Sequence, residues 1–322
     1  MAEQDQRLAL ERWVIDGQIP EHWYVALCAD PRFPVACLEL STRMLRAAEG
    51  DQALDGMVKD AGRFLAANWA VYLHLTGGLT LPRLKDLCAT SNLLSPGRAR
   101  AVLIYLQYLG YVRPLPLAAR GETRRYAPTP SLMRAFQTQI QAGLEAACVI
   151  EPAMASVLTR LDEPAALEKF LKIQGDGFVI VAPLSDQTSP FFRIFLHRHA
   201  GMQMLHLILV SAAEEDGFPP RGPVSISAAA AARRLRVSRP HVMRLLADAE
   251  REGLLTRGPG GTVTLSASTR DSIQRMLAAR LIGYMICAAK TAREISPLEA
   301  SRPTPAPRLS PGGSAQPNAT AS

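Results

Sequence analysis

Three hydrogen-bond donors within one short segment, Arg239, His241 and Arg244, have the side-chain chemistry that can read DNA bases. A guanidinium group can donate two parallel hydrogen bonds to O6 and N7 of guanine, which discriminates against a wrong base by about 1–3 kcal/mol. Apolar residues at i, i+3, i+4 and i+7 predict a helix with one buried face, formed by Val242, Leu245, Leu246 and Ala249. The three donors lie off this stripe, so we expect them on the exposed face of that helix.

The same helix pattern occurs twice, at a constant offset of 143 residues. Residues 95–110 read SPGRARAVLIYLQYLG and residues 238–253 read SRPHVMRLLADAEREG. Each copy begins with a serine that can cap free backbone N–H groups and ends with a glycine that can adopt the left-handed conformation. The first copy repeats the apolar stripe with Ala99, Val102, Leu103 and Leu106. The long offset indicates a duplication or fusion of domains rather than a short solenoid repeat.

Residues 231–246, AARRLRVSRPHVMRLL, resemble the helix-turn-helix of bacterial transcriptional regulators almost position by position. In this resemblance Ala232 is the small residue that lets the two helices approach, and Leu235 and Val237 are the apolar residues of the turn. Ser238 then starts the recognition helix. Residues 254–257, the GPGG at 258–261 and residues 262–265 predict a strand, a tight turn and a strand, which together are typical of a wing.

The first copy has the same order of elements. We assign its leading helix to residues 84–90, its turn to Leu93 and Leu94, its wing strands to 111–114 and 124–127, and the wing tip to 115–123. The chain therefore resembles two tandem winged helix-turn-helix modules of the MarR-like kind, over roughly residues 60–150 and 200–293. The first copy departs from the family pattern in two places. Asn92 stands where the second copy has Leu235, and the Gly97 that follows Pro96 costs about 1 kcal/mol relative to alanine inside a helix.

The expected fold class is mainly α, with small β-hairpin wings. The composition of the 322 residues, 48% hydrophobic and 20% charged, is ordinary for a soluble globular protein of two or three domains. Strand-like runs are few apart from the wings and residues 177–182 (GFVIVA). We expect five divisions of the chain. Residues 1–60 are an acidic helical segment with helices at 6–17 and 34–50, residues 61–153 a first module, and residues 154–200 a connecting segment. Residues 201–295 are a second module, and residues 296–322 a disordered Pro/Ser/Ala/Gly tail.

Positive charge is concentrated on the two modules. Residues 61–160 carry 11 basic and 4 acidic side chains, and residues 221–322 carry 15 and 6. Residues 1–60 carry 6 basic and 11 acidic side chains, and residues 161–220 carry 4 and 8. Segregated basic charge is the electrostatic footprint of a protein that neutralises DNA phosphates, and the acidic N-terminal segment is expected to dock on the modules or on a partner.

The resemblance and the charge together give a candidate set for binding double-stranded DNA. Arg239, His241 and Arg244 are expected to meet bases, as are Arg98 and Arg100 in the first copy. The remaining arginines, before the second turn and on the wings, are expected to meet phosphate or a narrow minor groove. The full set is Ser95, Arg98, Arg100, Arg120, Arg124, Arg125, Arg233, Arg234, Arg236, Ser238, Arg239, His241, Arg244 and Arg257. For any one arginine, a solvated surface position is the competing interpretation.

Helices at residues 131–147 and 269–289 follow the two wings. In related families such helices form a dimer interface, so a homodimer through these helices is one expectation, and packing of the two modules within one chain is the other. Two unlike modules in one polypeptide would bind an asymmetric site with half-sites about one helical turn apart. A small apolar effector at the interface of the helices is a family-level expectation, without assigned residues.

We expect no catalytic site, cofactor or metal. His197 and His199 are spaced i, i+2 and point to different faces of a helix, and Gly175-Asp176-Gly177 matches no phosphate-binding loop. Five cysteines without metal-ligand spacing fit reduced thiols, and Cys88 is either a redox sensor in the first leading helix or an ordinary buried thiol. Neither a signal peptide nor a membrane span is recognisable, so a soluble, cytoplasmic, nucleoid-associated protein is expected.

Three functions fit these patterns. The first is sequence-specific DNA binding that regulates transcription. The second is a tandem winged-helix replication initiator or partition protein, which directly repeated sites at an origin would favour. The third is a winged-helix scaffold for protein partners, against which the segregated basic charge counts.

Overall fold

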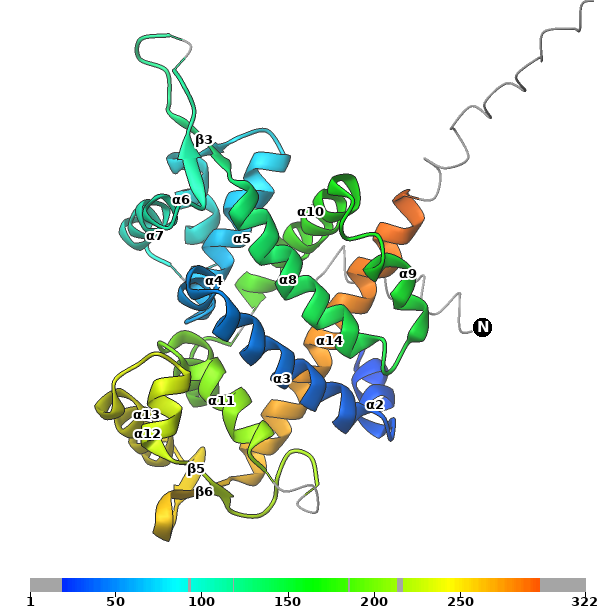
Figure 1. Cartoon of the computed structure of the whole chain (residues 1–322), viewed down its shortest axis with the longest axis vertical. Coiled ribbons are helices and arrows are strands. Elements are labelled where there is room, and N and C mark those ends of the chain that lie inside the picture. The colour runs from blue at the N-terminus through cyan, green and yellow to red at the C-terminus, as the bar shows by residue number, and fades with distance from the viewer. Residues whose placement is uncertain (1–18, 92–93, 118, 185, 213–216, 296–322) are drawn as a thin grey trace, which may run out of the picture.

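The computed structural model describes residues 19–91, 94–117, 119–184, 186–212 and 217–295. These residues are mainly helical, with two three-stranded antiparallel sheets, so the expected fold class is confirmed at this level (Figure 1). The helix expected at residues 6–17 and the tail expected at 296–322 lie outside the described residues.

Two parts of the chain have the same order of elements: helix, strand, two helices, two strands, helix. Module one consists of α5 (Ala61–Leu75), β1 (Leu79–Thr80), α6 (Leu81–Thr90), α7 (Pro96–Tyr108), β2 (Val112–Pro114), β3 (Arg125–Pro128) and α8 (Pro130–Ala147). Module two consists of α11 (Gly201–Val210), β4 (Val224–Ser225), α12 (Ala228–Arg234), α13 (Arg239–Arg251), β5 (Leu255–Arg257), β6 (Thr262–Leu265) and α14 (Ala267–Ile295). The sheets have equivalent strand orders, β1-β3-β2 and β4-β6-β5. Helices α7 and α13 begin and end 143 residues apart, as do β2 and β5.

Local sequence explains why α7 and α13 form where they do. The side chain of Ser95 accepts a hydrogen bond from the backbone N–H of Arg98 at 3.3 Å, and Ser238 caps α13 in the same way through His241 at 3.2 Å. A glycine with φ of +70° follows the end of each helix, a conformation that most residues adopt only with strain. The expected helix boundaries are therefore confirmed in both copies.

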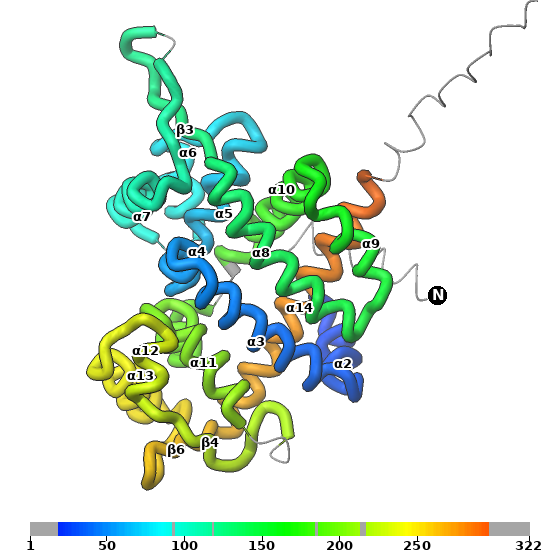
Figure 2. Tube along the Cα trace, in the orientation of Figure 1, coloured from blue at the N-terminus to red at the C-terminus, as the bar shows by residue number. Residues whose placement is uncertain are grey.

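The remaining elements join and separate the modules. They are α2 (Glu21–Ala29), α3 (Phe33–Gly50), α4 (Gln52–Met57), η1 (Pro152–Met154), α9 (Ala155–Leu158), α10 (Pro164–Val181), η2 (Ala182–Leu184), the π-helix η3 (Phe192–His197) and η5 (Pro259–Gly261). In Figures 1 and 2, α3 lies between α8 of module one and α11 of module two, α7 and α13 lie on the same side of the view, and the β2–β3 hairpin extends beyond the body of the molecule.

One continuous apolar core extends through both modules and the helices between them. Helix α8 packs on α3 and α14, and the Tyr284 ring of α14 lies directly over Gly143 of α8. The apolar residues of α14 that a homodimer would use are buried or half-buried within the chain: Ile273, Met276, Leu277, Ala279, Ile282, Met285 and Ile286. The trailing helices were expected either to form a homodimer interface or to pack the two modules together within one chain. The structure shows them packed within one chain.

Residues 177–182 are not a strand, contrary to the sequence-based expectation. Residues 177–181 form the end of α10, and Ala182 begins η2. Helix α10 buries a helical stripe that includes Phe170, Leu171 and Gln174. A Cβ atom at Gly175 would collide with the ring of Tyr72, so this glycine allows α10 to approach α5 closely. Tertiary packing overrides the β-propensity of the Phe-Val-Ile-Val run.

Candidate nucleic-acid interface

Helix α13 has three faces with different surroundings. Its apolar stripe, Val242, Leu245, Leu246 and Ala249, is buried in module two. The face opposite this stripe is exposed and carries Arg239, Met243, Arg244 and Arg251. Within the described part of the chain Arg239 makes no hydrogen bond or ion pair, and Arg244 donates only a weak 3.4 Å bond to the carbonyl oxygen of Pro240. Arg239 and Arg244 therefore present guanidinium groups that are free to bind a ligand, whereas Arg251 pairs with Asp248 of the same helix.

The third face of α13 is covered by the segment around η3. His241 Nε2 lies 2.8 Å from the carbonyl oxygen of His199, and the two imidazole rings meet edge to face at 5.6 Å. Asp248 pairs with Arg198, and Glu252 pairs with Arg193 at 2.7 Å. His241, which the sequence pattern predicts on the exposed face, is thus directed toward η3 instead. Burial is the main cause that lowers the pKa of His199, which favours its neutral form.

Arg98 occupies in α7 the position of His241 in α13 and has the same role. Its guanidinium lies 3.2 Å from Asp60 and 3.4 Å from Nε2 of His197. The segment around η3 therefore touches both α7 and α13, which fixes the two helices relative to each other. Neither Arg98 nor His241 is on the free face of its helix.

The free face of α7 differs from that of α13. It carries Arg100 and Ala101 together with two exposed apolar side chains, Ile104 at 53% and Tyr108 at 85% exposure. The equivalent positions of Ile104 and Tyr108 in α13 are Ala247 and Arg251. The two faces therefore present different chemistry, basic in module two and largely apolar in module one.

Two of the arginines expected at phosphate are bound to α3. Arg234 pairs with Glu49 at 2.5 Å, and Arg236 donates to the carbonyl oxygens of Ala48 at 3.2 Å and Glu49 at 2.6 Å. Arg233 is exposed, and the described residues include no partner for it. Of this arginine cluster, only Arg233 is free for a phosphate.

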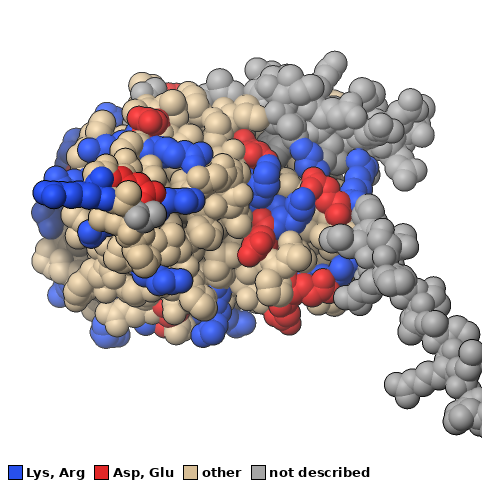
Figure 3. Space-filling view, turned by 90° about the horizontal axis from the view of Figure 1, so that it is seen from above, with Lys and Arg blue, Asp and Glu red and all other residues tan. Residues whose placement is uncertain are grey.

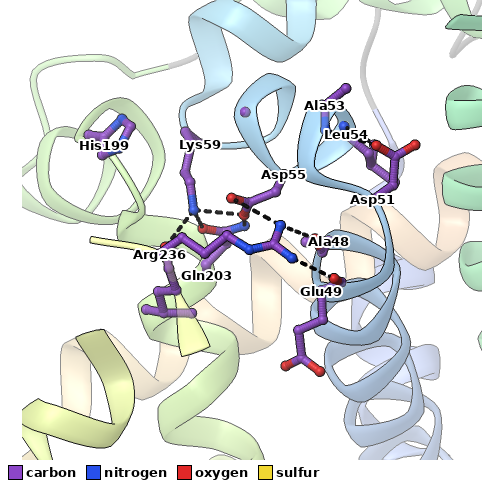
Figure 4. A network of polar contacts seen from close by, with 12 residues as sticks. Ala48, Glu49, Asp51, Ala53, Leu54, Asp55, Lys59, His199, Gln203 and Arg236 are labelled. Carbon is purple, nitrogen blue, oxygen red and sulfur yellow. Dashed lines mark hydrogen bonds and ion pairs between the residues drawn. The ribbon is translucent and has the colours of Figure 1, made fainter. Parts of the chain in front are cut away.

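A buried polar network lies where these arginines meet α4 (Figure 4). All three N–H groups of the Lys59 ammonium donate: to Asp55 at 2.7 Å, to Gln203 at 2.9 Å and to the carbonyl oxygen of Leu235 at 2.6 Å. Arg236 approaches the second oxygen of Asp55 at 3.8 Å. Burial lowers the pKa of Lys59, although its bond to Asp55 acts in the opposite direction. The network binds the turn before α13 to α4.

Of the wing arginines, too, one is bound within the chain and others are exposed. Arg257 is bound to Glu250 through its backbone N–H at 2.9 Å and its guanidinium at 2.7 Å. Arg120 and Arg124 are exposed near the tip of the β2–β3 hairpin. Arg125 is also exposed, and its guanidinium lies so close to Gly78 that a Cβ there would be 2.6 Å away.

Positive side chains dominate one side of the module-one end. Viewed from the top of Figure 1, Lys and Arg gather on the left, the side of α6, α7 and the hairpin, whereas Lys, Arg, Asp and Glu are mixed on the right (Figure 3). Two acidic side chains of the N-terminal segment pair with module two, Glu49 with Arg234 and Glu21 with Arg275, each at 2.5 Å. Others, such as Glu39 with Arg43, pair within the segment. Residues 19–60 therefore pack on the modules, which is one of the two expectations for this segment, and residues 1–18 lie outside the described residues.

The sequence pattern misses Arg251, which is 72% exposed at its side chain and pairs with Asp248 at 2.7 Å. Its position seven residues after Arg244 places it on the same face of α13, so helical periodicity could have identified it. The contacts of η3 and α3 with the modules leave no comparable signal because they join distant parts of the chain.

Cys88 is an ordinary buried thiol. Burial raises the pKa of this thiol to about 12, so it is not a reactive thiolate. Among the described residues, no group of three or more His, Cys, Asp and Glu side chains is arranged to hold a metal ion. None of the described helices combines the length and the apolar character needed to cross a bilayer.

Comparison with family models, with curated proteins and with solved structures gives no match for this chain.

Proposed function

We propose that this chain binds double-stranded DNA at specific sequences and regulates transcription, with modules one and two acting as tandem winged helix-turn-helix units of the MarR-like kind. The order of elements and the strand orders of both modules support this assignment. In such a unit the second helix of the pair lies in the major groove, and the hairpin after it contacts the backbone.

The observation that carries the proposal is the free face of α13. It lies opposite the buried stripe and presents Arg239 and Arg244, which make no ion pair within the described residues, together with Arg251, which pairs with Asp248 of the same helix. Neighbouring arginines of the same module are bound to α3 or Glu250. Arginines on a free helix face suit bidentate contacts with guanine, and those near the ends of the helix suit phosphates. Arg233 and the hairpin arginines of module one would add contacts to the backbone.

Fluorescence anisotropy of a labelled duplex at several salt concentrations tests this proposal. The logarithm of Kd should rise linearly with the logarithm of the salt concentration, because counterions are released when phosphates are neutralised. Arg244→Ala combined with Arg251→Ala should weaken binding at least tenfold, whereas Arg293→Ala, which removes an exposed arginine near the end of α14, should leave it unchanged. No binding of any duplex at moderate salt would refute the proposal.

The α7 face favours protein docking as a second candidate function. Ile104 and Tyr108 are exposed where the equivalent helix of module two has Ala247 and Arg251. A protein partner on module one and DNA on module two would use both faces. Tyr108→Ala that leaves DNA affinity unchanged, while it abolishes co-purification of a specific partner, would support this division. If Tyr108→Ala lowered the affinity for DNA, the exposed faces of both α7 and α13 would be DNA-binding.

A further inference from the structure

A cavity of about 410 Å³ lies between the modules, beneath α3 and against α14. Its walls come from both modules and the helices between them, and they are mostly apolar, with side chains such as Met44, Phe64, Phe178 and Phe192. Its volume is within the range of about 300–1,000 Å³ that is typical of small-molecule sites. The function proposed above makes no use of this cavity.

One wall of the cavity carries a cation without an anionic partner. Arg280 of α14 is half-buried and, within the described residues, makes no ion pair. Its guanidinium donates to Nε2 of His206 at 3.2 Å. His206 in turn donates from Nδ1 to Ser41 at 2.9 Å, because the Ser41 hydroxyl donates to the carbonyl oxygen of Cys37 at 2.8 Å. This chain of bonds fixes the direction of Arg280 without neutralising its charge.

Helix α8 contributes to the cavity a buried acceptor without a donor. Gln139 is 4% exposed, and its amide donates to the hydroxyl of Tyr284 at 2.5 Å, but its Oε1 has no hydrogen-bond partner. A buried acceptor of this kind is unfavourable because it has lost its water without gaining a donor. Arg280 lies four residues before Tyr284 on α14, so the two side chains share one face of this helix. Consistent with this, Arg280 opposes the rise that burial causes in the pKa of Tyr284. The unpaired cation and the unpaired acceptor are therefore linked through one hydroxyl.

We propose that this cavity binds a small apolar molecule that carries a carboxylate and, close to it, a hydroxyl or amide N–H group. The carboxylate pairs with Arg280, the neighbouring donor bonds to Gln139 Oε1, and the apolar part fills the space between the modules. Neither polar group of such a ligand would be left unsatisfied, which is the condition for burying them.

Isothermal titration calorimetry of the full chain with β-hydroxydecanoate tests the proposal. Decanoate, which lacks the hydroxyl, and the corresponding diol, which lacks the carboxylate, are the comparison probes. The hydroxy acid should bind at least tenfold more tightly than either. Arg280→Gln should lower the affinity for the hydroxy acid to that for the diol. Gln139→Leu should lower the affinity for the hydroxy acid to that for decanoate. Arg293→Gln, which alters an exposed arginine of the same helix, should change nothing.

Gly283→Leu provides an independent test that does not touch the polar wall. Gly283 lines the cavity, and a Cβ at this position would meet no atom within 4 Å, so a larger side chain enters the cavity without displacing backbone. This variant should fold, as judged by its Tm, and bind none of the three probes. The proposal is overturned if the hydroxy acid fails to bind the wild-type chain, if Arg280→Gln leaves its affinity unchanged, or if the folded Gly283→Leu variant still binds it.

Discussion

Lys59 Nζ lies 2.6 Å from the carbonyl oxygen of Leu235, so a lysine that follows α4 holds the turn that precedes α13. Its other two N–H groups bind Asp55 and Gln203, which leaves the ammonium fully paired although it is 4% exposed. The orientation of α13, and with it the proposed DNA-reading face, therefore depends also on Lys59 and Asp55, which lie outside module two.

Removing this lysine should destabilise the protein strongly. Lys59→Met leaves Asp55 buried and without its ammonium partner, and the loss of one partner of a buried pair costs about 3–5 kcal/mol. Lys172→Met is a matched control because Lys172 and Asp176 have the same four-residue separation but are exposed, a pair worth about 0–1 kcal/mol. Urea unfolding measures both. Equal losses for the two variants would contradict the importance of the network.

The arginines of the α13 face should determine base preference. Arg244→Ala should cost about 1–3 kcal/mol for the preferred duplex and relax the preference at one position. His241→Ala, which removes a contact with His199 rather than a free side chain, should retain the wild-type order of preference among duplexes. Competition among duplexes that differ at single base pairs distinguishes the two variants. If only His241→Ala relaxed the base preference, the face of α13 that reads bases would be the one with His241 and not the one with Arg244.

The hairpin arginines should act without regard to sequence. Arg120→Ala with Arg124→Ala should weaken all duplexes alike, and the slope of log Kd against log salt should fall by about one for each phosphate that is no longer neutralised. Anisotropy titrations at several salt concentrations on specific and scrambled duplexes give both quantities. A change confined to the specific duplex would show that the hairpin reads bases.

His206 should make the protein sensitive to acid. Burial, with a smaller contribution from Arg280, lowers its pKa to about 3, whereas an unfolded histidine titrates near 6.5. The unfolded state therefore binds the proton first. The stabilisation is fully present above about pH 6.5 and is lost as the pH falls toward 3, by up to about 4–5 kcal/mol. His206→Gln should flatten the unfolding free energy over this range, and an unchanged pH profile would count against a neutral buried histidine.

Two helix glycines should respond oppositely to alanine. Gly283→Ala should stabilise the protein by about 1 kcal/mol, because the new methyl group projects into open space and alanine favours the helix. Gly143→Ala should destabilise it by about 1–3 kcal/mol, because the new Cβ collides with the ring of Tyr284. Thermal unfolding of the two variants checks the pair. Stabilisation by both would mean that α8 and α14 pack less closely than described.

Local patterns predict the elements of this fold well, and long-range contacts account for what they miss. The boundaries of α7 and α13 follow from a serine cap, an apolar stripe and a closing glycine, all within one helix. The residues that bind Arg234 and Arg236 lie 181 or more positions away, so no local pattern indicates them. The direction of His241 depends similarly on His199, in a segment whose packing between α7 and α13 only the folded chain reveals.

Selection of bound duplexes from a random pool by the purified chain tests the central claim most directly. The unlike free faces of α7 and α13 predict one enriched asymmetric site. We expect the chain to bind this site at least about a thousandfold more tightly than a scrambled duplex at physiological salt. We expect the double variant Arg244→Ala with Arg251→Ala to abolish the enrichment. A pool that shows no enrichment after selection, with wild-type binding equal for all duplexes or absent, would contradict the account.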